Sequence, residues 1–285
     1  MLKKNVETFL GCDADYDEAR LVIFGAPFDS TTSYRPGARF ASRVMRAESY
    51  GLETYSPYQN LDVTDYKIFD GGDLELCFGD TELALGDITR LAEKILGDEK
   101  IPVMLGGEHL VTLGAIRAAV KKFPTLAVIH FDAHADLRDD YLGAKLSHAT
   151  VMRRTYDLVG DGKIFQFGIR SGDRAEFLFA ENHTRLKKFD FGGLEKVCAE
   201  VGGLPIYLTI DLDVLDPAVF PGTGTPEAGG VNFLQLLHAA LKVIRSCDVV
   251  ALDLVELSPP YDPSGISTAT ALKILREILL ALSSK

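Results

Sequence analysis

Three side chains that can bind a cation follow one apolar run at alternate positions. The stretch VIHFDAHADLRDDY, residues 128–141, places Asp132, His134 and Asp136 directly after a segment that predicts a buried strand. In an extended chain, alternate side chains point to the same side, so this pattern aims three ligands at one place. Because a buried carboxylate without a partner is costly, we expect a cation among them.

Three other apolar runs are also followed by polar clusters. These are Ile101–Leu105 before His109, Ile206–Ile210 before Asp211 and Asp213, and Val249–Leu254 before Glu256. Ligands of open parallel sheets bind beyond the carboxyl ends of the strands, so the clusters can converge there. Together they offer two imidazoles and four carboxylates as metal ligands: His109, Asp132, His134, Asp136, Asp211 and Asp213.

Six ligands exceed what one four-coordinate zinc ion takes from a protein. Two ions about 3.5 Å apart, with bridging carboxylates, would use all six and would activate a water molecule. An oxygen-rich ligand set with one imidazole per ion suits Mn²⁺ better than softer metals. Any one cluster alone is compatible with solvated acids at a strand end. Their joint occurrence after apolar runs favours the two-metal site.

Short apolar runs alternate with longer amphipathic ones along the whole chain. The predicted strands are Arg20–Phe24, Ile101–Leu105, Leu126–Phe131, Ile164–Phe167, Ile206–Ile210 and Val249–Leu254. The predicted helices are Thr81–Leu96, Leu110–Lys122, Asn232–Arg245, with Asn232 as N-cap, and Ser267–Leu282. Alternation of this kind predicts an α/β fold, a parallel sheet with helices on both faces. We expect one domain spanning residues 1–285.

Glycine-rich stretches and one buried histidine complete the predicted organisation. Gly71-Gly72 and Gly202-Gly203 predict turns, and Phe220–Gly230 predicts an irregular functional loop after a strand. His130 precedes Asp132 by two residues, so in an extended strand it points to the same side as the ligands, but it lies inside the apolar run. We expect it to be a core residue or a support for a metal ligand.

Composition excludes several classes of protein. The net charge is 30 − 41 = −11, which argues against binding to nucleic acid or to anionic membranes and mildly favours cationic ligands. The sequence contains no apolar run of about 18 residues, and its N-terminus does not resemble a secretory signal. The four scattered cysteines suit a reducing compartment, so we expect a cytoplasmic protein.

The motifs resemble the ureohydrolases, a family that includes arginase and agmatinase. The resemblance runs from GAPFDSTTSYRPGARFASRVMR through GGEH, HFDAHADLRDDY, LSHAT, QFGIRSGD and TIDLDVLDPAVFPGTGTPEAGG to DLVELSPPYDPSG, with the agmatinase branch most similar. It implies an arginase-like, three-layer α/β/α fold with a mainly parallel sheet, two Mn²⁺ ions per subunit, and a homo-oligomer, either a trimer or a hexamer. It assigns His109, Asp132, Asp136 and Asp211 to one ion and Asp132, His134, Asp211 and Asp213 to the other.

The resemblance also implies hydrolysis of agmatine to putrescine and urea by a metal-bridging hydroxide. Glu256 can accept hydrogen bonds from a guanidinium group, whose planar donors match a carboxylate. His148 in LSHAT, with a pKa expected near neutrality, can shuttle a proton to the leaving amine. Thr225 in GTGTP resembles a residue that lies near the substrate in this family. Asp173 in GIRSGD is a candidate partner for the distal amine of agmatine.

The distal end of the substrate stays open at this point. Arg138 follows Asp136 in a D-L-R sequence similar to that of formimidoylglutamase, and Arg138, Lys145 or Arg174 could bind a carboxylate instead. Guanidinobutyrate, guanidinopropionate, arginine and formimidoylglutamate are therefore alternative substrates. A non-catalytic paralogue and a one-zinc deacetylase are weaker alternatives, because no ligand of the six is missing.

Overall fold

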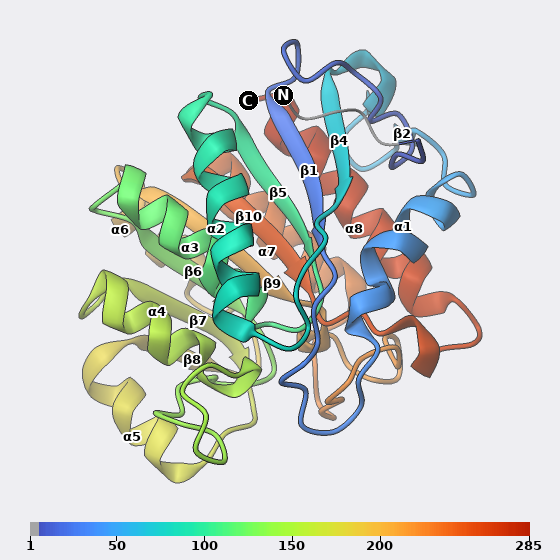
Figure 1. Cartoon of the computed structure of the whole chain (residues 1–285). Coiled ribbons are helices and arrows are strands. Elements are labelled where there is room, and N and C mark those ends of the chain that lie inside the picture. Colours follow the sequence, from blue (N-terminus) through green and yellow to red (C-terminus); the bar gives the residue numbers. More distant parts are fainter. Residues whose placement is uncertain (1–5) are drawn as a thin grey trace.

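A parallel sheet of eight strands crosses the molecule in Figure 1, a computed structural model that describes residues 6–285. The strands lie in the order β4-β1-β5-β10-β9-β6-β7-β8, and each neighbouring pair is parallel. Their bounds are β1 Leu21–Ala26, β4 Ile68–Asp73, β5 Ile101–Gly106, β6 Ala127–Phe131, β7 Ile164–Ile169, β8 Arg185–Lys188, β9 Pro205–Asp211 and β10 Asp248–Val255. A separate antiparallel pair joins β2, Tyr55–Ser56, to β3, Leu61–Asp62.

Helices cover both faces of this sheet (Figure 1). They are α1 Ala41–Ser49, α2 Thr81–Gly97, α3 Val111–Lys122, α4 Val151–Val159, α5 Arg174–His183, α6 Leu194–Val201, α7 Phe233–Ser246 and α8 Ile266–Ser283. One apolar core includes side chains of α1, α6, α7 and α8, and a second core on the other face includes those of α2, α3, α4 and α5. The three-layer α/β/α fold predicted from the sequence is therefore confirmed.

The six predicted strands are all present, with ends shifted by at most two residues. The edge strands β4 and β8 were not predicted, because β8 reads RLKK and is largely exposed, and β4 ends in DGGD. The prediction of a turn at Gly71-Gly72 is wrong, since both residues lie within β4. Gly72 has a φ of 79°, and the register shifts there, so the pair forms a bulge and not a turn.

The four predicted helices correspond to α2, α3, α7 and α8. Asn232 caps α7 as expected, because its side chain accepts a hydrogen bond from the Gln235 amide at 3.0 Å. The unpredicted α1, α4, α5 and α6 are short, and short helices derive their stability from tertiary packing more than from periodicity. The loop over residues 220–230 is irregular, as expected. Within residues 6–285, the structure contains no helix of the length and hydropathy needed to cross a bilayer.

Candidate active site

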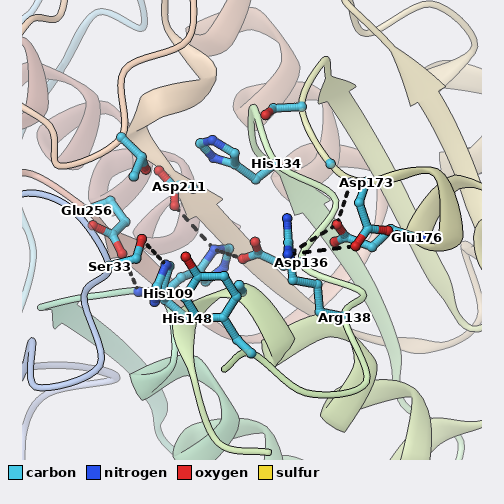
Figure 2. Close-up of a pocket in the computed structure, with 15 residues that line it drawn as sticks. Ser33, His109, His134, Asp136, Arg138, His148, Asp173, Glu176, Asp211 and Glu256 are labelled. Carbon is cyan, nitrogen blue, oxygen red and sulfur yellow. Dashed lines mark hydrogen bonds and ion pairs between the residues drawn. The ribbon is translucent and has the colours of Figure 1, made fainter. Parts of the chain in front are cut away.

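The four strands that carry the polar clusters are adjacent in the middle of the sheet, in the order β5-β10-β9-β6. Because they are parallel, their carboxyl ends lie at the same edge, which brings His109, Asp132, Asp211 and Glu256 together. Figure 2 shows the resulting site, with side chains from separate loops directed into a common space. The predicted convergence of the clusters is thus present in the structure.

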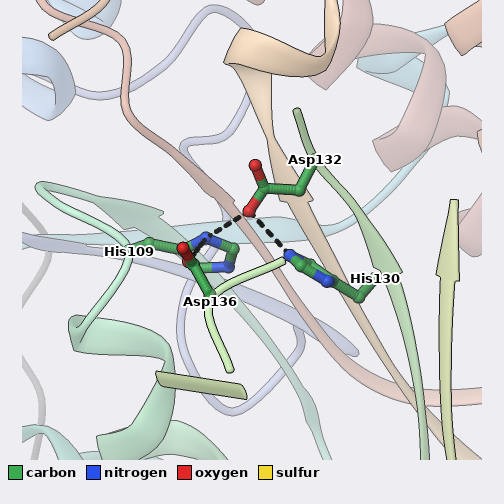
Figure 3. A group of neighbouring side chains, drawn as sticks. All are labelled: His109, His130, Asp132 and Asp136. Atoms are coloured by element: carbon green, nitrogen blue, oxygen red, sulfur yellow. Dashed lines mark hydrogen bonds and ion pairs between the residues drawn. The ribbon is translucent and has the colours of Figure 1, made fainter. Parts of the chain in front are cut away.

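The first group of ligand atoms surrounds the Nδ1 atom of His109. This nitrogen lies 3.0 Å from Asp132 Oδ2, 3.2 Å from Asp136 Oδ2 and 3.2 Å from Asp211 Oδ2 (Figure 3 shows Asp132 and Asp136). His109 is 1% exposed and Asp132 is fully buried. Four ligands predicted for one ion therefore meet around a single point.

The second group is built around His134. Its Nδ1 lies 2.9 Å from Asp213 Oδ2 and 3.5 Å from Asp132 Oδ1, so Asp132 contributes one oxygen to each group. Asp213 is held in place by the Ala133 amide, which donates to Oδ1 at 3.1 Å. The Asp213 amide in turn donates to Asp211 Oδ1 at 2.8 Å. The six predicted ligands form two adjoining clusters that share Asp132. Asp211 contacts the His109 cluster, and its assignment to the second ion as well stays a prediction.

The protonation of His109 fits a metal ligand. Thr209 Oγ1 donates its proton to Asp253 Oδ1 at 2.6 Å, so it can only accept from His109 Nε2, which lies 3.0 Å away. The proton of the neutral ring is then on Nε2, and Nδ1 presents a lone pair. Within residues 6–285 this buried Nδ1 has no hydrogen-bond partner. A lone pair that faces three carboxylates is repulsive unless a proton or a metal cation lies between them. Burial lowers the pKa of His109, but the three carboxylates raise it more, so it ends well above its usual value, and a metal ion at this point would take the place of that proton.

The buried carboxylates of the two clusters also lie close enough to repel one another. Burial and then the charge of Asp132 raise the pKa of Asp136 to about 7. Burial, followed by the charges of Asp213 and Asp132, raises the pKa of Asp211 well above its usual value. Divalent cations at this point would neutralise these charges and keep the acids ionised. The residues present therefore fit a pair of divalent metal ions.

His130 lies in the same group of side chains as His109, Asp132 and Asp136, and its ring contacts Asp132. The Nε2 atom of this fully buried ring lies 2.7 Å from Asp132 Oδ2 (Figure 3), and its Nδ1 lies 3.1 Å from Gln166 Nε2. The Gln166 carbonyl oxygen accepts from Thr184 Oγ1, so the amide nitrogen is the donor to His130. Both ring nitrogens are therefore used, which fits a residue that orients Asp132, one of the two roles expected for His130.

A cavity of about 260 Å³ opens above the ligand cluster, and Figure 2 shows residues that line it. Glu256 lies at its wall with a φ of 64°, an unusual conformation for a residue with a side chain. Its Oε1 accepts from the His109 amide at 2.7 Å. Burial, and then the nearby Glu108, raise the pKa of Glu256 well above its usual value. A buried acid in a strained backbone conformation beside a cavity is typical of a ligand-binding residue.

His148 also lines the cavity, but its pKa is not near neutrality, which corrects the value expected from the sequence. Burial is the main cause that lowers the pKa of His148 to about 4. Its Nε2 lies 3.1 Å from Ser33 Oγ, and its Nδ1 lies 3.2 Å from Ser147 Oγ. The ring is therefore neutral at physiological pH. A neutral imidazole can accept a proton, and once charged it is a stronger acid than an ordinary histidine.

Comparison with known proteins identifies the family. The model of the arginase family matches residues 19–281. The chain belongs to the arginase family. It is an enzyme of the ureohydrolase type, and family membership together with the clustered histidines and aspartates implies a binuclear metal site.

Individual relatives within the arginase family are also similar over nearly the whole chain. The agmatinase of Bacillus subtilis is 46% identical over 277 residues, covering 96% of each chain. The guanidinobutyrase of Pseudomonas aeruginosa is 36% identical, covering 94% of this chain and 88% of that protein. A crystal structure from Clostridium difficile, described as a candidate agmatinase, is 54% identical with a TM-score of 0.92, covering 95% of this chain and 99% of that one.

Two further predicted residues of this arginase-family site lie at the cavity wall. Thr225 lines the cavity, and its hydroxyl lies 3.4 Å from Asp213 Oδ2. Asp173 lines it too, although its Oδ1 also caps α5 by accepting from the Glu176 amide at 3.0 Å. Arg138 lies beside Asp173 and Glu176, with guanidinium nitrogens 3.7 Å from Asp173 Oδ2 and 3.4 Å from Glu176 Oε2. The acidic end of the cavity is therefore partly neutralised.

The sequence did not reveal several residues that hold the site together. Arg170 donates to five backbone carbonyl oxygens at 2.7–3.3 Å, including those of Asp213 and Glu227, and so ties the loop of Thr225 to a ligand strand. Glu108 is fully buried beside His109 and binds the loop after β1. In the sequence, these residues could be noticed only as charged side chains within or just after an apolar run. That pattern does not show which groups they contact.

Proposed function

We propose that this ureohydrolase hydrolyses the guanidinium group of agmatine to putrescine and urea. The observation that carries the proposal is the convergence of six metal ligands beneath a small cavity that Glu256 and His148 also line. The similarity to the agmatinase of Bacillus subtilis, 46% over nearly the full length, supports agmatine as the substrate.

The chain's own residues account for binding and proton transfer in this reaction. The two clusters would hold a pair of divalent ions, for which we propose Mn²⁺, and such ions would lower the pKa of a water molecule at the site. Glu256 accepts hydrogen bonds from the guanidinium nitrogens, and the positive charge offsets the cost of its burial. His148 takes a proton as the water attacks and returns it to the leaving amine. Thr225 contacts the guanidinium group through its backbone or its hydroxyl.

Asp173 is our proposed partner for the distal amine of agmatine. Its Oδ1 is used by α5, its Oδ2 lies 3.7 Å from Arg138, and the residue lines the cavity. Asp139 is less suited, because it pairs with Arg154 at 2.9 Å.

Arg138 supports a second candidate substrate with a carboxylate at the distal end. It lines the cavity, whereas Lys145 and Arg174 are not among the lining residues of the described chain. The similarity to a guanidinobutyrase, at 36%, points the same way. Agmatine is preferred because Glu176 and Asp173 already pair with Arg138, which leaves this end of the cavity with a net negative charge.

One comparison of substrates tests this proposal. The purified protein, loaded with Mn²⁺, is offered agmatine, arginine, guanidinobutyrate, guanidinopropionate and formimidoylglutamate, and urea is measured, or formamide for the last. We expect agmatine to be turned over fastest. Faster turnover of guanidinobutyrate would transfer the assignment to the carboxylated substrate.

The role of His148 has its own test. A His148→Ala variant should keep its bound metal and lose turnover by about 10²- to 10⁴-fold, the usual contribution of a general acid or base. Unchanged turnover of agmatine would remove His148 from the mechanism. Metal content measured by elemental analysis serves as the control for the integrity of the site.

We further propose two Mn²⁺ ions per subunit, a homo-oligomer (trimer or hexamer) and a cytoplasmic location. The metal count follows from the two ligand clusters that share Asp132. Elemental analysis after purification without added metal measures the identity and number of the ions, and light scattering measures the mass of the assembly. A single ion per fully active subunit would contradict the paired-metal mechanism.

A further inference from the structure

Both ring nitrogens of His148 face serine hydroxyls, and the two serines differ in one respect. Ser33 Oγ lies 3.1 Å from Nε2, and Ser147 Oγ lies 3.2 Å from Nδ1. Ser33 lines the cavity, whereas Ser147 is 1% exposed and is not among the lining residues within the described chain. Figure 2 shows Ser33 among the lining residues, with its contact to His148 drawn. The Nε2 atom of His148 therefore contacts a hydroxyl group whose residue also lines the cavity, whereas Nδ1 contacts one whose residue does not.

A buried acid fixes the loop that carries Ser33. Glu108 accepts from the Thr31 amide at 3.0 Å, from Thr31 Oγ1 at 2.6 Å and from Thr32 Oγ1 at 3.1 Å. The same Thr31 hydroxyl accepts from the backbone amide of His148 at 3.1 Å. One carboxylate thus holds the loop of Ser33, and through Thr31 it also holds the backbone of His148.

Backbone hydrogen bonds also join the loop after β1 to the segment that follows β5. The amide of Glu108 donates to the carbonyl oxygen of Phe28 at 2.8 Å, and that of Gly107 donates to Ala26 at 2.9 Å. A Cβ atom at Gly107 would lie 1.9 Å from the Phe28 carbonyl oxygen, so glycine is required there. The contact between Ser33 and His148 therefore belongs to a built connection between the loop after β1 and the metal-bearing end of β5.

We propose that Ser33 is a proton-relay residue, whose hydroxyl carries the proton between His148 and the leaving amine. This inference rests on the proposed function. As the C–N bond breaks, its electron pair stays on the amine nitrogen, which takes the hydroxyl proton of Ser33. Ser33 Oγ takes the Nε2 proton of His148 at the same time, and the neutral ring is restored. The proton itself comes from the attacking water, so nothing further is consumed.

The chemistry of a hydroxyl group suits this task. A serine hydroxyl rotates freely and is both donor and acceptor, so it passes on a proton without carrying charge itself. Ser147 does not reach the cavity, and it accepts from Nδ1 while the ring is charged. Ser33 transfers the proton, and Ser147 holds the ring.

Two substitutions at position 33 test the relay. Ser33→Ala should lower kcat for agmatine about tenfold to about hundredfold, part of the usual contribution of acid–base catalysis, with KM and metal content little changed. Ser33→Thr keeps the hydroxyl and should restore most of kcat. Ser30→Ala, at an exposed serine of the same loop, is the matched control and should behave as the wild type. Equal losses in Ser33→Ala and Ser33→Thr would overturn the relay.

A double-mutant cycle with His148→Ala shows whether the two residues act together. If Ser33 acts through His148, adding Ser33→Ala to His148→Ala should cost little further kcat. Fully additive losses would overturn the proposal.

One readout does not depend on turnover. The ¹⁵N chemical shift of His148 Nε2 should move in Ser33→Ala and stay near the wild-type value in Ser33→Thr. Absence of urea release from agmatine by the wild type would refute the proposed function, whereas an unmoved Nε2 shift in an active enzyme would refute the relay alone.

Discussion

Substituting Thr209 by valine should weaken metal binding at the His109 cluster without removing any ligand. Valine is nearly isosteric with threonine, so the change removes the hydroxyl that accepts from His109 Nε2 at 3.0 Å and donates to Asp253 at 2.6 Å. Asp253 keeps its bond from Tyr207 at 2.6 Å, so the main loss falls on His109. The Nε2 proton then has no acceptor, and the ring can move its proton to Nδ1, the nitrogen needed for the metal.

The magnitude follows from the burial of this contact. A buried donor without an acceptor costs about 1–3 kcal/mol. Since about 1.4 kcal/mol corresponds to a tenfold change in affinity, metal binding at this cluster should weaken about 5- to 150-fold. This range agrees with the loss of about 10- to 100-fold usual for residues that orient a metal-binding histidine.

Competition with a calibrated chelator measures both metal affinities of the apoprotein. In Thr209→Val, the metal affinity of the His109 cluster should fall, and that of the His134 cluster should change much less. Thr155→Val is the matched control, because Thr155 is buried and its hydroxyl has no hydrogen-bond partner among residues 6–285. Two unchanged affinities in Thr209→Val would refute the assignment of the His109 proton to Nε2.

The remaining predictions concern the second metal cluster, the distal subsite and acid stability. Asp213→Asn should reduce metal occupancy and turnover together, measured by elemental analysis and urea release; full turnover with one ion per subunit would contradict the paired-metal site. Asp173→Asn should raise KM for agmatine with little change in kcat, and an unchanged KM would separate Asp173 from the substrate. Burial alone would raise the pKa of Asp262, but hydrogen bonds from Ser264 and Ser267 lower it to about 2. Because this lies below the unfolded value of about 3.9, the carboxylate stabilises the fold above about pH 4, and the effect is lost as the pH falls toward 2. The difference in unfolding free energy between wild type and Asp262→Asn, measured with urea, should therefore shrink from pH 6 to pH 2.5, and a constant difference would show that the charge has no part.

Some parts of the fold were predictable because they depend on local patterning. The central strands are buried on both faces and therefore read as continuous apolar runs, as in LAVIHF before Asp132. The edge strand β8 is polar and β4 contains a bulge, so neither shows that pattern. The low pKa of His148 was also beyond prediction, since burial by other segments lowers it.

The sequence by itself determined the chemical groups of the site, because D-x-H-x-D and D-x-D place ligands at strand ends whatever the strand order. Only the tertiary structure decided which groups meet. The strand order β5-β10-β9-β6 makes the four ligand-bearing ends neighbours, and the register places Thr209 beside Asp253, where it can fix the proton of His109. Ser33 is more than a hundred residues from His148 in sequence and meets it through the loop that Glu108 holds. Contacts of this kind depend on how distant segments pack, and no local pattern in the chain encodes them.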